Sequence, residues 1–396
     1  MQSVVLAAGE GVRLRPFTES IPKVMVPIAN RPILEYVIDS LVHNGVRDII
    51  VVVGYKKESI MDYFQNGKEF NANIQYVIQD KQLGTGHALI QAKEYLKGRF
   101  LILPGDNIIS RKTLENILDQ KHASLLVTES DIPSKYGVVE LEKDIIKNIV
   151  EKPIEIVGNL ISTGIYILNK NILTSIEEHT SQGINELTSS VQHLIENGEE
   201  IQVLKNKGLW ADAVYPWDLL SLNELVLHSQ HSALGGTIEE DVNIKGKVYV
   251  GKNSVIRSGT YIVGPVVIGE GCEIGPHSCI FPSTSIGNSV SIGAFSEVRQ
   301  SILMDDVRIG SHSSISHSIL GKGCHIGKNV IQIVGKSFVK INGDFIPVDA
   351  IGSFIGDDSF IGSSTTISAG KLLGKSCTTS PMKTIVSNIE SNSHVM

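Results

Sequence analysis

The first 230 residues alternate between short apolar runs and segments whose apolar residues recur every three or four positions. The runs Asp48–Gly54 and Arg99–Pro104 are almost continuously apolar, which is typical of strands covered on both faces. Segments 32–45, 58–67 and 86–98 have the periodicity of amphipathic helices, and each ends at a glycine. This alternation predicts an α/β domain with a mostly parallel sheet between two layers of helices.

From about residue 240 the aliphatic residues recur every six positions instead. Ten of them keep this spacing without a break: Ile244, Val250, Ile256, Ile262, Ile268, Ile274, Ile280, Ile286, Ile292 and Val298. Neither an α-helix nor a flat strand has a period of six, whereas a coil with three six-residue sides per turn does. The repeat then slips, and it resumes with Ile355, Ile361, Ile367 and Leu373. A parallel β-helix of hexapeptide repeats is therefore expected.

The change of period divides the chain. We expect an α/β domain over 1–228, a linker over 229–241 and the β-helix over 242–378. Segment 334–349 breaks the repeat and is expected to protrude as a loop. Residues 379–396 are rich in Ser, Thr and Asn, and they are expected to form a polar tail.

Composition excludes several classes of protein. The chain has 396 residues, 42% of them apolar and 19% charged, and a net charge of -7, which argues against a broad nucleic-acid-binding face. No stretch approaches 18 consecutive apolar residues, and a strand begins near residue 3, so we expect a cytoplasmic protein without a signal peptide or membrane span. The four cysteines lie far apart, which favours reduced thiols over a zinc site.

The loop after the first apolar run contains Gly9, Gly11 and Arg13, and Lys23 follows between two prolines. A dinucleotide-binding fingerprint would require a third glycine at position 14, where this chain has Leu14, and the lysine-ending P-loop spacing is also absent. Backbone N–H groups of a glycine turn and nearby fixed cations can still bind phosphate oxygens. Taken alone, the motif also fits a glycine turn with basic residues on the surface.

The stretches "LAAGEGVRLRP" and "PKVMVPIANRPILEY" together resemble the signature of the sugar-1-phosphate nucleotidylyltransferases. Further motifs of that family follow in order across the first domain, among them "VIQDKQLGTGHAL", "LPGD" and "LWADA". The resemblance implies a Rossmann-like α/β nucleotidyltransferase domain whose loop binds the nucleotide triphosphate. The implied nucleotide-binding loop residues are Leu6, Ala7, Ala8, Gly9 and Gly11, and the implied catalytic cations are Arg13 and Lys23.

The same resemblance assigns the nucleotide base and a metal. Gln79 would read the pyrimidine edge, and Gly84 and Thr85 would pack on the nucleotide. Asp106 follows an apolar strand at its carboxyl end, where open α/β sheets bind ligands. The resemblance implies that Asp106 contacts the nucleotide and, with Asp212, holds Mg²⁺, a cation that suits one or two carboxylates plus substrate phosphates.

The motifs "SKYGVVE", "IVEKP" and "ISTGIYIL" resemble the family's sugar-phosphate pocket, which would contain Tyr136, Gly137, Glu151, Lys152, Thr163 and Gly164. Glu151 would accept protons from sugar hydroxyls, and Lys152 would bind the sugar phosphate. Ser162 departs from the family, because many relatives have Asn there. The implied reaction joins UTP or dTTP to N-acetylglucosamine 1-phosphate or glucose 1-phosphate and releases pyrophosphate; UTP with N-acetylglucosamine 1-phosphate is favoured.

The second half resembles the left-handed β-helix of archaeal-type bifunctional enzymes of UDP-N-acetylglucosamine synthesis. In that family the β-helix forms trimers and acetylates glucosamine 1-phosphate with acetyl-CoA, using a histidine base. In "RIGSHSSISHSIL", His312 is shifted by one residue from the expected place and the neighbouring motif residues are missing. Either His312, His317 or His325 serves as an acetyltransferase base, with His312 nearest the expected place, or all three are plain repeat residues on a trimerising scaffold, in a homotrimer or a dimer of trimers. A non-catalytic scaffold resembling the translation-initiation exchange-factor subunits is a further alternative, which the retained phosphate-loop and carboxylate residues disfavour.

Overall fold

The computed structural model describes residues 1–155 and 158–396, which form two compact units. The first unit comprises Met1–Glu10, Pro22–Met25 and Ile33–Asp212. The second comprises Gly11–Ile21, Val26–Pro32 and Ala213–Met396. Two short N-terminal segments thus belong to the same unit as the C-terminal half, which the sequence did not indicate.

The first unit is built on a nine-stranded sheet in the order β5-β4-β1-β6-β11-β8-β12-β10-β9. Its strands are β1 (Gln2–Ala7), β4 (Asp48–Val53), β5 (Asn73–Ile78), β6 (Arg99–Pro104), β8 (Ser124–Glu129), β9 (Gly137–Glu142), β10 (Ile145–Glu151), β11 (Leu160–Asn169) and β12 (Gln202–Lys205). β1 pairs in parallel with β4 and β6, β4 with β5, and β8 with β12. β11 lies antiparallel between β6 and β8. The predicted α/β nucleotidyltransferase fold is confirmed, and its sheet is mixed: β5-β4-β1-β6 is parallel, whereas β11, β10 and β9 run antiparallel to their neighbours.

Helices cover both faces of this sheet: α1 (Ile33–His43), α2 (Lys57–Phe64), α3 (Thr85–Gln91), α4 (Arg111–Leu118), α5 (Ile172–Ser181) and α6 (Leu187–Glu196). Successive strand residues serve opposite cores, so Val4 packs with α3, α5 and α6 while Val5 packs with α1, α2 and α4. Burial on both faces explains why the strands are almost continuously apolar. None of the helices in the described ranges is long and apolar enough to span a membrane.

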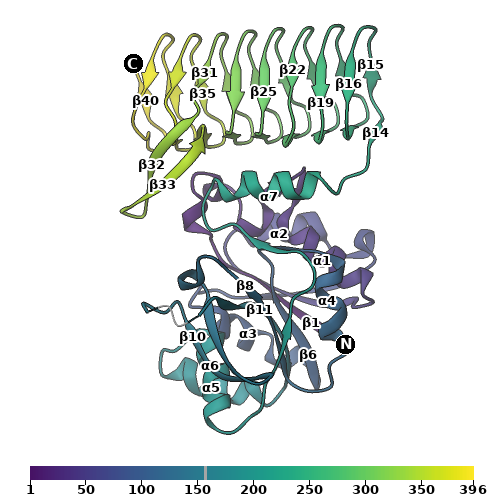
Figure 1. Ribbon diagram of the computed structural model, residues 1–396, viewed down its shortest axis with the longest axis vertical. Helices are drawn as coiled ribbons and strands as arrows, with labels where there is room; N and C mark the ends of the chain where they lie inside the picture. The colour runs from purple at the N-terminus through teal and green to yellow at the C-terminus, as the bar shows by residue number, and fades with distance from the viewer. Residues whose placement is uncertain (156–157) are drawn as a thin grey trace. The chain divides into compact units, whose positions relative to one another are not determined.

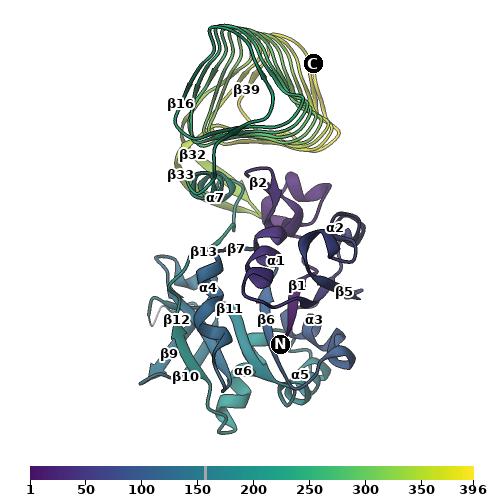
Figure 2. The same cartoon turned by 90° about the vertical axis from the view of Figure 1, so that its right-hand side faces the viewer.

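The second unit is a left-handed parallel β-helix with three sheets, whose triangular cross-section is seen in Figure 2. One sheet contains β14 (Ala233–Leu234), β17 (Val248–Val250), β20 (Val266–Ile268), β23 (Thr284–Ile286), β26 (Ile302–Leu303), β29 (Ile319–Leu320), β34 (Ser353–Ile355) and β37 (Lys371–Leu373). The next contains β15 (Thr237–Ile238), β18 (Val255–Ile256), β21 (Glu273–Ile274), β24 (Ser291–Ile292), β27 (Arg308–Ile309), β30 (His325–Ile326), β35 (Phe360–Ile361), β38 (Thr378–Thr379) and β40 (His394–Val395). The third contains β16 (Asn243–Lys245), β19 (Tyr261–Val263), β22 (Cys279–Ile280), β25 (Glu297–Arg299), β28 (Ser314–Ser316), β31 (Ile331–Gln332), β36 (Thr366–Ile367) and β39 (Thr384–Ile385).

The period of six corresponds to one inward side chain on each side of the coil. Ile268 pairs with Ile286 one coil later, and both side chains are 0% exposed. The slip in the repeat marks a shorter coil, because Ile286 pairs with Leu303, 17 residues later instead of 18. The hexapeptide-repeat prediction is confirmed, since stacking of these aliphatic side chains forms the continuous core of the second unit.

The interruption at 334–349 is an antiparallel hairpin of β32 (Gly335–Ile341) and β33 (Asp344–Ile351), which extends from the coil in Figure 1. Helix α7 (Asp218–Leu227) precedes the coil in the same unit. Smaller elements are the pair β2 (Pro27–Ile28) and β3 (Arg31–Pro32), and the pair β7 (Asn107–Ile109) and β13 (Trp210–Asp212).

Two boundaries expected from the sequence are wrong. The linker over 229–241 already contains β14 and β15, which pair with β17 and β18. The polar tail over 379–396 contains β39 and β40, so the coil continues there. The physical reason is visible at Thr379, whose buried hydroxyl accepts a 2.9 Å hydrogen bond from the Gly362 N–H and so replaces the usual inward aliphatic side chain.

Candidate active site

The glycine loop follows β1 directly. A Cβ atom placed on Gly9 would meet no atom within 4 Å, so space lies open beside its backbone. Gly11 has φ of 75°, a left-handed conformation that favours glycine, and leads the chain into the 3-10 helix Val12–Leu14. Arg13 is exposed on that short helix and belongs to the second unit, whereas Gly9 belongs to the first.

The residues before the glycines anchor the loop. The Leu6 carbonyl accepts a 2.8 Å hydrogen bond from the Gly105 N–H, next to Asp106 in the chain. The Ala8 carbonyl accepts a 3.1 Å hydrogen bond from the Tyr55 N–H. Leu6 and Ala8, with buried Ala7 between them, therefore tie the loop to neighbouring strand ends at the carboxyl edge of the sheet.

Lys23 bridges two carboxylates. Its Nζ lies 2.6 Å from Oδ2 of Asp106 and 2.6 Å from Oδ1 of Asp212. The side chains of Lys23 and Asp212 are each only 13% exposed. Burial alone would lower the pKa of Lys23, but the two carboxylates outweigh it and hold the pKa well above its usual range. The ammonium is therefore a fixed positive charge at the carboxyl edge of the sheet.

Strand pairing brings these two carboxylates together. β7 begins immediately after Asp106, and antiparallel pairing with β13 places Asp212 opposite Asn107. The two carboxylates converge on one cation-sized position, which Lys23 Nζ occupies. Within 1–155 and 158–396 no group of three or more His, Cys, Asp or Glu residues could hold a metal. A pair of carboxylates fits Mg²⁺, which takes few protein ligands and completes its coordination with water and substrate phosphates.

Gln79 is buried with its amide held in a fixed orientation. Its Nε2 donates to the Gly84 carbonyl at 3.1 Å and to Nδ1 of His87 at 2.8 Å. The backbone carbonyl of Gln79 accepts a 3.1 Å hydrogen bond from Nε2 of Gln82. Because both amide protons are engaged, the side chain presents Oε1 as its acceptor.

Gly84 and Thr85 pack against the segment that leads into α6. A Cβ on Gly84 would lie 2.6 Å from the Asn185 carbonyl oxygen, so glycine is required there. The Thr85 hydroxyl donates to Oε2 of Glu186 at 3.0 Å and accepts from the Leu187 N–H at 3.0 Å. The sequence analysis missed Asn185 and Glu186, whose only signal was a polar stretch before an amphipathic helix.

Four of the expected sugar-pocket residues lie together. The pairing of β9 and β10 places Glu151 opposite Gly137, and the Lys152 N–H donates to the Tyr136 carbonyl at 3.0 Å. Lys152 Nζ lies 3.1 Å from Oε1 of Glu151. Oε2 of Glu151 accepts a 2.9 Å hydrogen bond from the hydroxyl of Thr188, a residue that the sequence analysis missed. The carboxylate is thus oriented at both oxygens.

The other two expected pocket residues have structural roles. The buried Thr163 hydroxyl donates to the Leu126 carbonyl at 2.6 Å. Gly164 has φ of 76°, and a Cβ there would lie 2.7 Å from Cγ of Pro104, so only glycine fits. The hydroxyls of Ser162 and Tyr166 lie 3.0 Å apart, and burial raises the pKa of Tyr166 to about 12. Tyr166 therefore stays protonated at neutral pH.

His312 lies on an exposed corner of the β-helix. Its ring stacks on Phe295 with ring centres 5.2 Å apart and planes 10° apart. Phe295 stacks in turn on His277, also at 5.2 Å. His312 has φ of 62°, a left-handed corner conformation shared by His277 and Phe295. The histidine that the sequence singled out is thus one rung of an aromatic stack.

Both halves of the chain are similar to known proteins. The nucleotidyl transferase family model matches residues 2–229, and the model of the GMPPB C-terminal domain matches residues 262–395. The bifunctional protein GlmU of Methanocaldococcus jannaschii is 36% identical over 406 residues, covering 100% of this chain and 97% of that protein. The bifunctional sugar-1-phosphate nucleotidylyltransferase/acetyltransferase of Sulfurisphaera tokodaii is 34% identical and covers 94% of each chain.

Proteins named as thymidylyltransferases are also similar. The glucose-1-phosphate thymidylyltransferase of Streptomyces antibioticus is 32% identical over 339 residues, covering 83% of this chain and 94% of that protein. A Bacillus anthracis crystal structure of a glucose-1-phosphate thymidylyltransferase candidate in complex with a sucrose has a TM-score of 0.54 at 27% identity, covering 59% of this chain and 98% of its own. The family match over more than half of the residues, with relatives 34 to 36% identical over nearly the whole chain, shows that this chain is an enzyme of the nucleotidyl transferase family.

Proposed function

We propose that this enzyme transfers a nucleotidyl group from UTP or dTTP to a sugar 1-phosphate, either N-acetylglucosamine 1-phosphate or glucose 1-phosphate, and releases pyrophosphate. The observation that carries the proposal is the ammonium of Lys23 held at 2.6 Å from both Asp106 and Asp212. The names of relatives that act as sugar-1-phosphate nucleotidylyltransferases and thymidylyltransferases support the choice of substrates.

The nucleotidyl transferase family generally uses Mg²⁺, and the residues of this site fit that cation. Asp106 and Asp212 would hold it, and its charge would offset the negative charge of the nucleotide phosphates. Lys23 and Arg13 supply further positive charge for the triphosphate, and the open backbone at Gly9 leaves room for phosphate oxygens.

The acceptor sugar phosphate would bind at Glu151 and Lys152. The fixed carboxylate of Glu151 accepts hydrogen bonds from sugar hydroxyls, and Lys152 pairs with the phosphate. A phosphate monoester is already ionised near neutral pH, so its oxygen can attack the α-phosphate without a strong general base. Rate enhancement then comes from in-line positioning and from cations that stabilise the transferring phosphoryl group.

The hydrogen bonding of Gln79 favours a nucleotide whose pyrimidine base has a ring N–H. Both amide protons are engaged with Gly84 and His87, which leaves Oε1 to accept a hydrogen bond. Uracil and thymine present an N3–H donor, whereas cytosine presents an unprotonated N3 acceptor that would face the same oxygen. A buried acceptor left unpaired disfavours the wrong base.

The test is pyrophosphate release by the full-length protein with Mg²⁺, across five nucleoside triphosphates and the 1-phosphates of glucose, N-acetylglucosamine and glucosamine. We expect UTP or dTTP to be the best donor, with N-acetylglucosamine 1-phosphate or glucose 1-phosphate as acceptor. Asp212→Asn should abolish the signal of the best pair. No release from any pair by the wild-type protein would contradict the proposal.

Acetyl transfer from acetyl-CoA to glucosamine 1-phosphate by the β-helix is a second proposed activity. It is supported by relatives named as bifunctional that cover 94 to 100% of this chain. His312 is the proposed base, in a trimer whose size light scattering would measure. We expect CoA release to be lost in His312→Ala and kept in the control His394→Ala. Equal release by both variants would exclude His312.

A further inference from the structure

The segment Gly11–Ile21, here called the arm, belongs to the same compact unit as the β-helix. Peptide bonds join it at each end to the first unit, at Glu10–Gly11 and at Ile21–Pro22. The arm carries Arg13, and Lys23 lies two residues beyond its end. The phosphate-loop motif therefore begins in the first unit with Gly9, crosses to the second unit at Gly11, and is back in the first unit at Lys23.

The arm has little regular structure of its own. It contains two 3-10 helices of three residues each, Val12–Leu14 and Phe17–Glu19. The Thr18 hydroxyl donates to the Gly11 carbonyl at 2.9 Å, a hydrogen bond that joins the later part of the arm to its first residue. Single turns of this kind are not stable alone, so the order of the arm depends on what it packs against.

Apolar contacts join the arm to the late coils of the β-helix. Phe17 is 1% exposed, and its ring centre lies 6.4 Å from that of Phe354 in an edge-to-face arrangement. The arm also approaches Gly356 closely: an added Cβ there would lie 2.9 Å from Cβ of Pro16, and 2.8 Å from the backbone of the next coil. This packing fixes the middle of the arm on one side of the coil.

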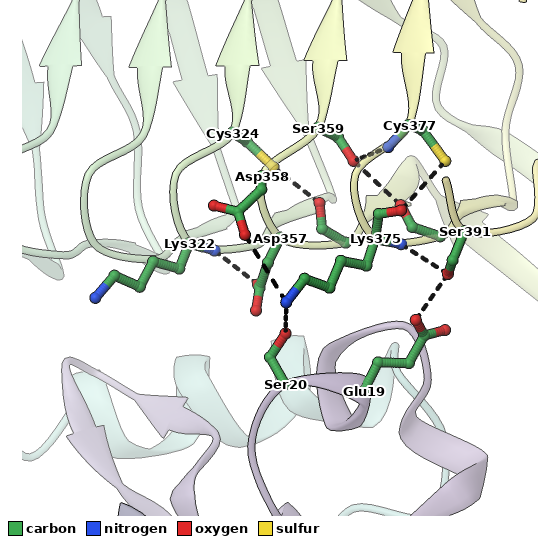
Figure 3. Close-up of polar contacts among 12 residues, drawn as sticks. Glu19, Ser20, Lys322, Cys324, Asp357, Asp358, Ser359, Lys375, Cys377 and Ser391 are labelled. Atoms are coloured by element: carbon green, nitrogen blue, oxygen red, sulfur yellow. Dashed lines mark hydrogen bonds and ion pairs between the residues drawn. The ribbon is translucent and has the colours of Figure 1, made fainter. Parts of the chain in front are cut away.

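Polar contacts then fix the end of the arm, as Figure 3 shows. The ammonium of Lys375 donates to the Ser20 hydroxyl at 3.0 Å, and Ser20 is also hydrogen-bonded to the buried carboxylate of Asp357. The Ser391 hydroxyl donates to Oε2 of Glu19 at 2.7 Å and accepts from the Lys375 N–H at 3.0 Å. Two consecutive arm residues, Glu19 and Ser20, are therefore held by side chains from three successive coils.

We propose that Lys375 and Ser391 are positioning residues for nucleotidyl transfer: they order the arm, and through the continuous chain they set the conformation in which Arg13 and Lys23 meet the triphosphate. The inference rests on the proposed role of those two cations. Through Lys375 and Ser391 the β-helix contributes to nucleotidyl transfer, and this contribution is separate from trimer formation and from acetyl transfer.

The charge and geometry of the network fit a positioning role. Lys375 supplies its backbone N–H to Ser391 and its ammonium to Ser20, so one residue orients both contacts to the arm. Lys322 is its counterpart two coils earlier, with a side chain paired to Asp306 at 3.7 Å instead of to the arm. The chain thus offers a matched control of the same residue type.

The experiment compares Lys375→Met, Lys375→Arg and Ser391→Ala with the control Lys322→Met in the full-length protein. We expect Lys375→Met and Ser391→Ala to raise KM for the nucleotide about tenfold, the usual effect of losing a hydrogen bond to a charged group, with KM for the sugar 1-phosphate unchanged. Lys375→Arg should restore most of the affinity, and Lys322→Met should match the wild type. A change of both KM values in equal proportion, or none, would overturn the proposal.

A second readout does not depend on turnover. Arg13 is exposed, so tryptic cleavage after it reports the order of the arm, and Lys375→Met should accelerate it several-fold. If Lys375→Met fails to fold, Ser391→Ala removes one hydroxyl and serves for both measurements. The activity of the wild-type protein tests the proposed function. The positioning of the arm by Lys375 and Ser391 is tested by two ratios of variant to wild type, one for the nucleotide Kd and one for the rate of tryptic cleavage. Unchanged ratios would refute the positioning role even in an active enzyme.

Discussion

Thr188 orients the carboxylate of Glu151. The hydroxyl of Thr188, in the first turn of α6, donates a 2.9 Å hydrogen bond to Oε2 of Glu151 at the end of β10. Lys152 Nζ lies 3.1 Å from the other oxygen, Oε1. A carboxylate held at both oxygens loses little conformational freedom when a sugar hydroxyl binds, which is the benefit of preorganisation.

Thr188→Ala should therefore weaken binding of the sugar 1-phosphate. Loss of one hydrogen bond to a charged group corresponds to about a tenfold rise in KM for this substrate. KM for the nucleotide should stay constant, because the contact to Glu151 lies in the proposed acceptor pocket. Steady-state kinetics of pyrophosphate release check this, with Thr188→Ser as the variant that keeps the hydroxyl. A Thr188→Ser enzyme as impaired as Thr188→Ala would contradict the assignment.

Asp106→Asn should lower kcat by about three orders of magnitude, because it removes one of two charges proposed to hold Mg²⁺ at the phosphates. The fold should persist, since Lys23 can still pair with Asp212 at 2.6 Å. Turnover with Mg²⁺ and the thermal midpoint are measured together. Asp144→Asn, an exposed residue outside the site, is the control. Near-normal turnover of Asp106→Asn would refute the metal role.

The sequence predicted the β-helix well because its signal repeats. Each coil has aliphatic residues at the same inward positions. Such residues recur at a fixed spacing in the sequence, as Ile262 and Ile280 do, which pair one coil apart. The prediction failed where polar side chains occupy the same positions. Thr379 is inward and hydrogen-bonded, and Gln332 is only 3% exposed on the inner face of β31, yet neither fits an aliphatic pattern.

The candidate site was predictable only in part. Glycine loops and strand-end aspartates have local sequence patterns, and family resemblance extended these to Gln79 and Glu151. The contact between Glu151 and Thr188 has no local pattern, because it depends on how α6 packs against β10. That packing includes a hydrogen bond from the Ile149 N–H to Oε1 of Gln192 at 2.8 Å. Side chains that only tertiary packing brings together have no characteristic spacing in the sequence, so the sequence alone does not predict their contact.

His87 should control the choice of base through Gln79. Its Nδ1 accepts a 2.8 Å hydrogen bond from Nε2 of Gln79, which fixes the direction of the amide. His87→Ala removes that acceptor and leaves the amide held only by its 3.1 Å hydrogen bond to the Gly84 carbonyl, so a rotated amide that presents a donor to cytosine becomes more accessible. We expect the ratio of kcat/KM for UTP over CTP to fall about tenfold, the effect of one lost hydrogen bond.

The control for this experiment is His87→Asn, whose side-chain oxygen can still accept from the amide. It should retain more of the base preference than His87→Ala does. Competition assays with both nucleotides in one reaction measure the ratio directly. An unchanged ratio in His87→Ala would show that other contacts orient Gln79.

Cys324 should make the β-helix sensitive to alkaline pH. Its side chain is fully buried, Sγ lies 3.1 Å from the Gly356 carbonyl oxygen, and burial raises the pKa of the thiol to about 12. An unfolded thiol ionises near pH 8.5, so between about pH 9 and 12 the unfolded state has lost a proton that the folded state keeps. The stabilising contribution of this thiol is thus complete below about pH 8.5, and it falls by about 1.4 kcal/mol per pH unit as the pH approaches 12. Denaturant unfolding of Cys324→Ala should show a shallower pH dependence than the wild type, with the half-buried Cys279→Ala as control; equal slopes for wild type and Cys324→Ala would contradict this.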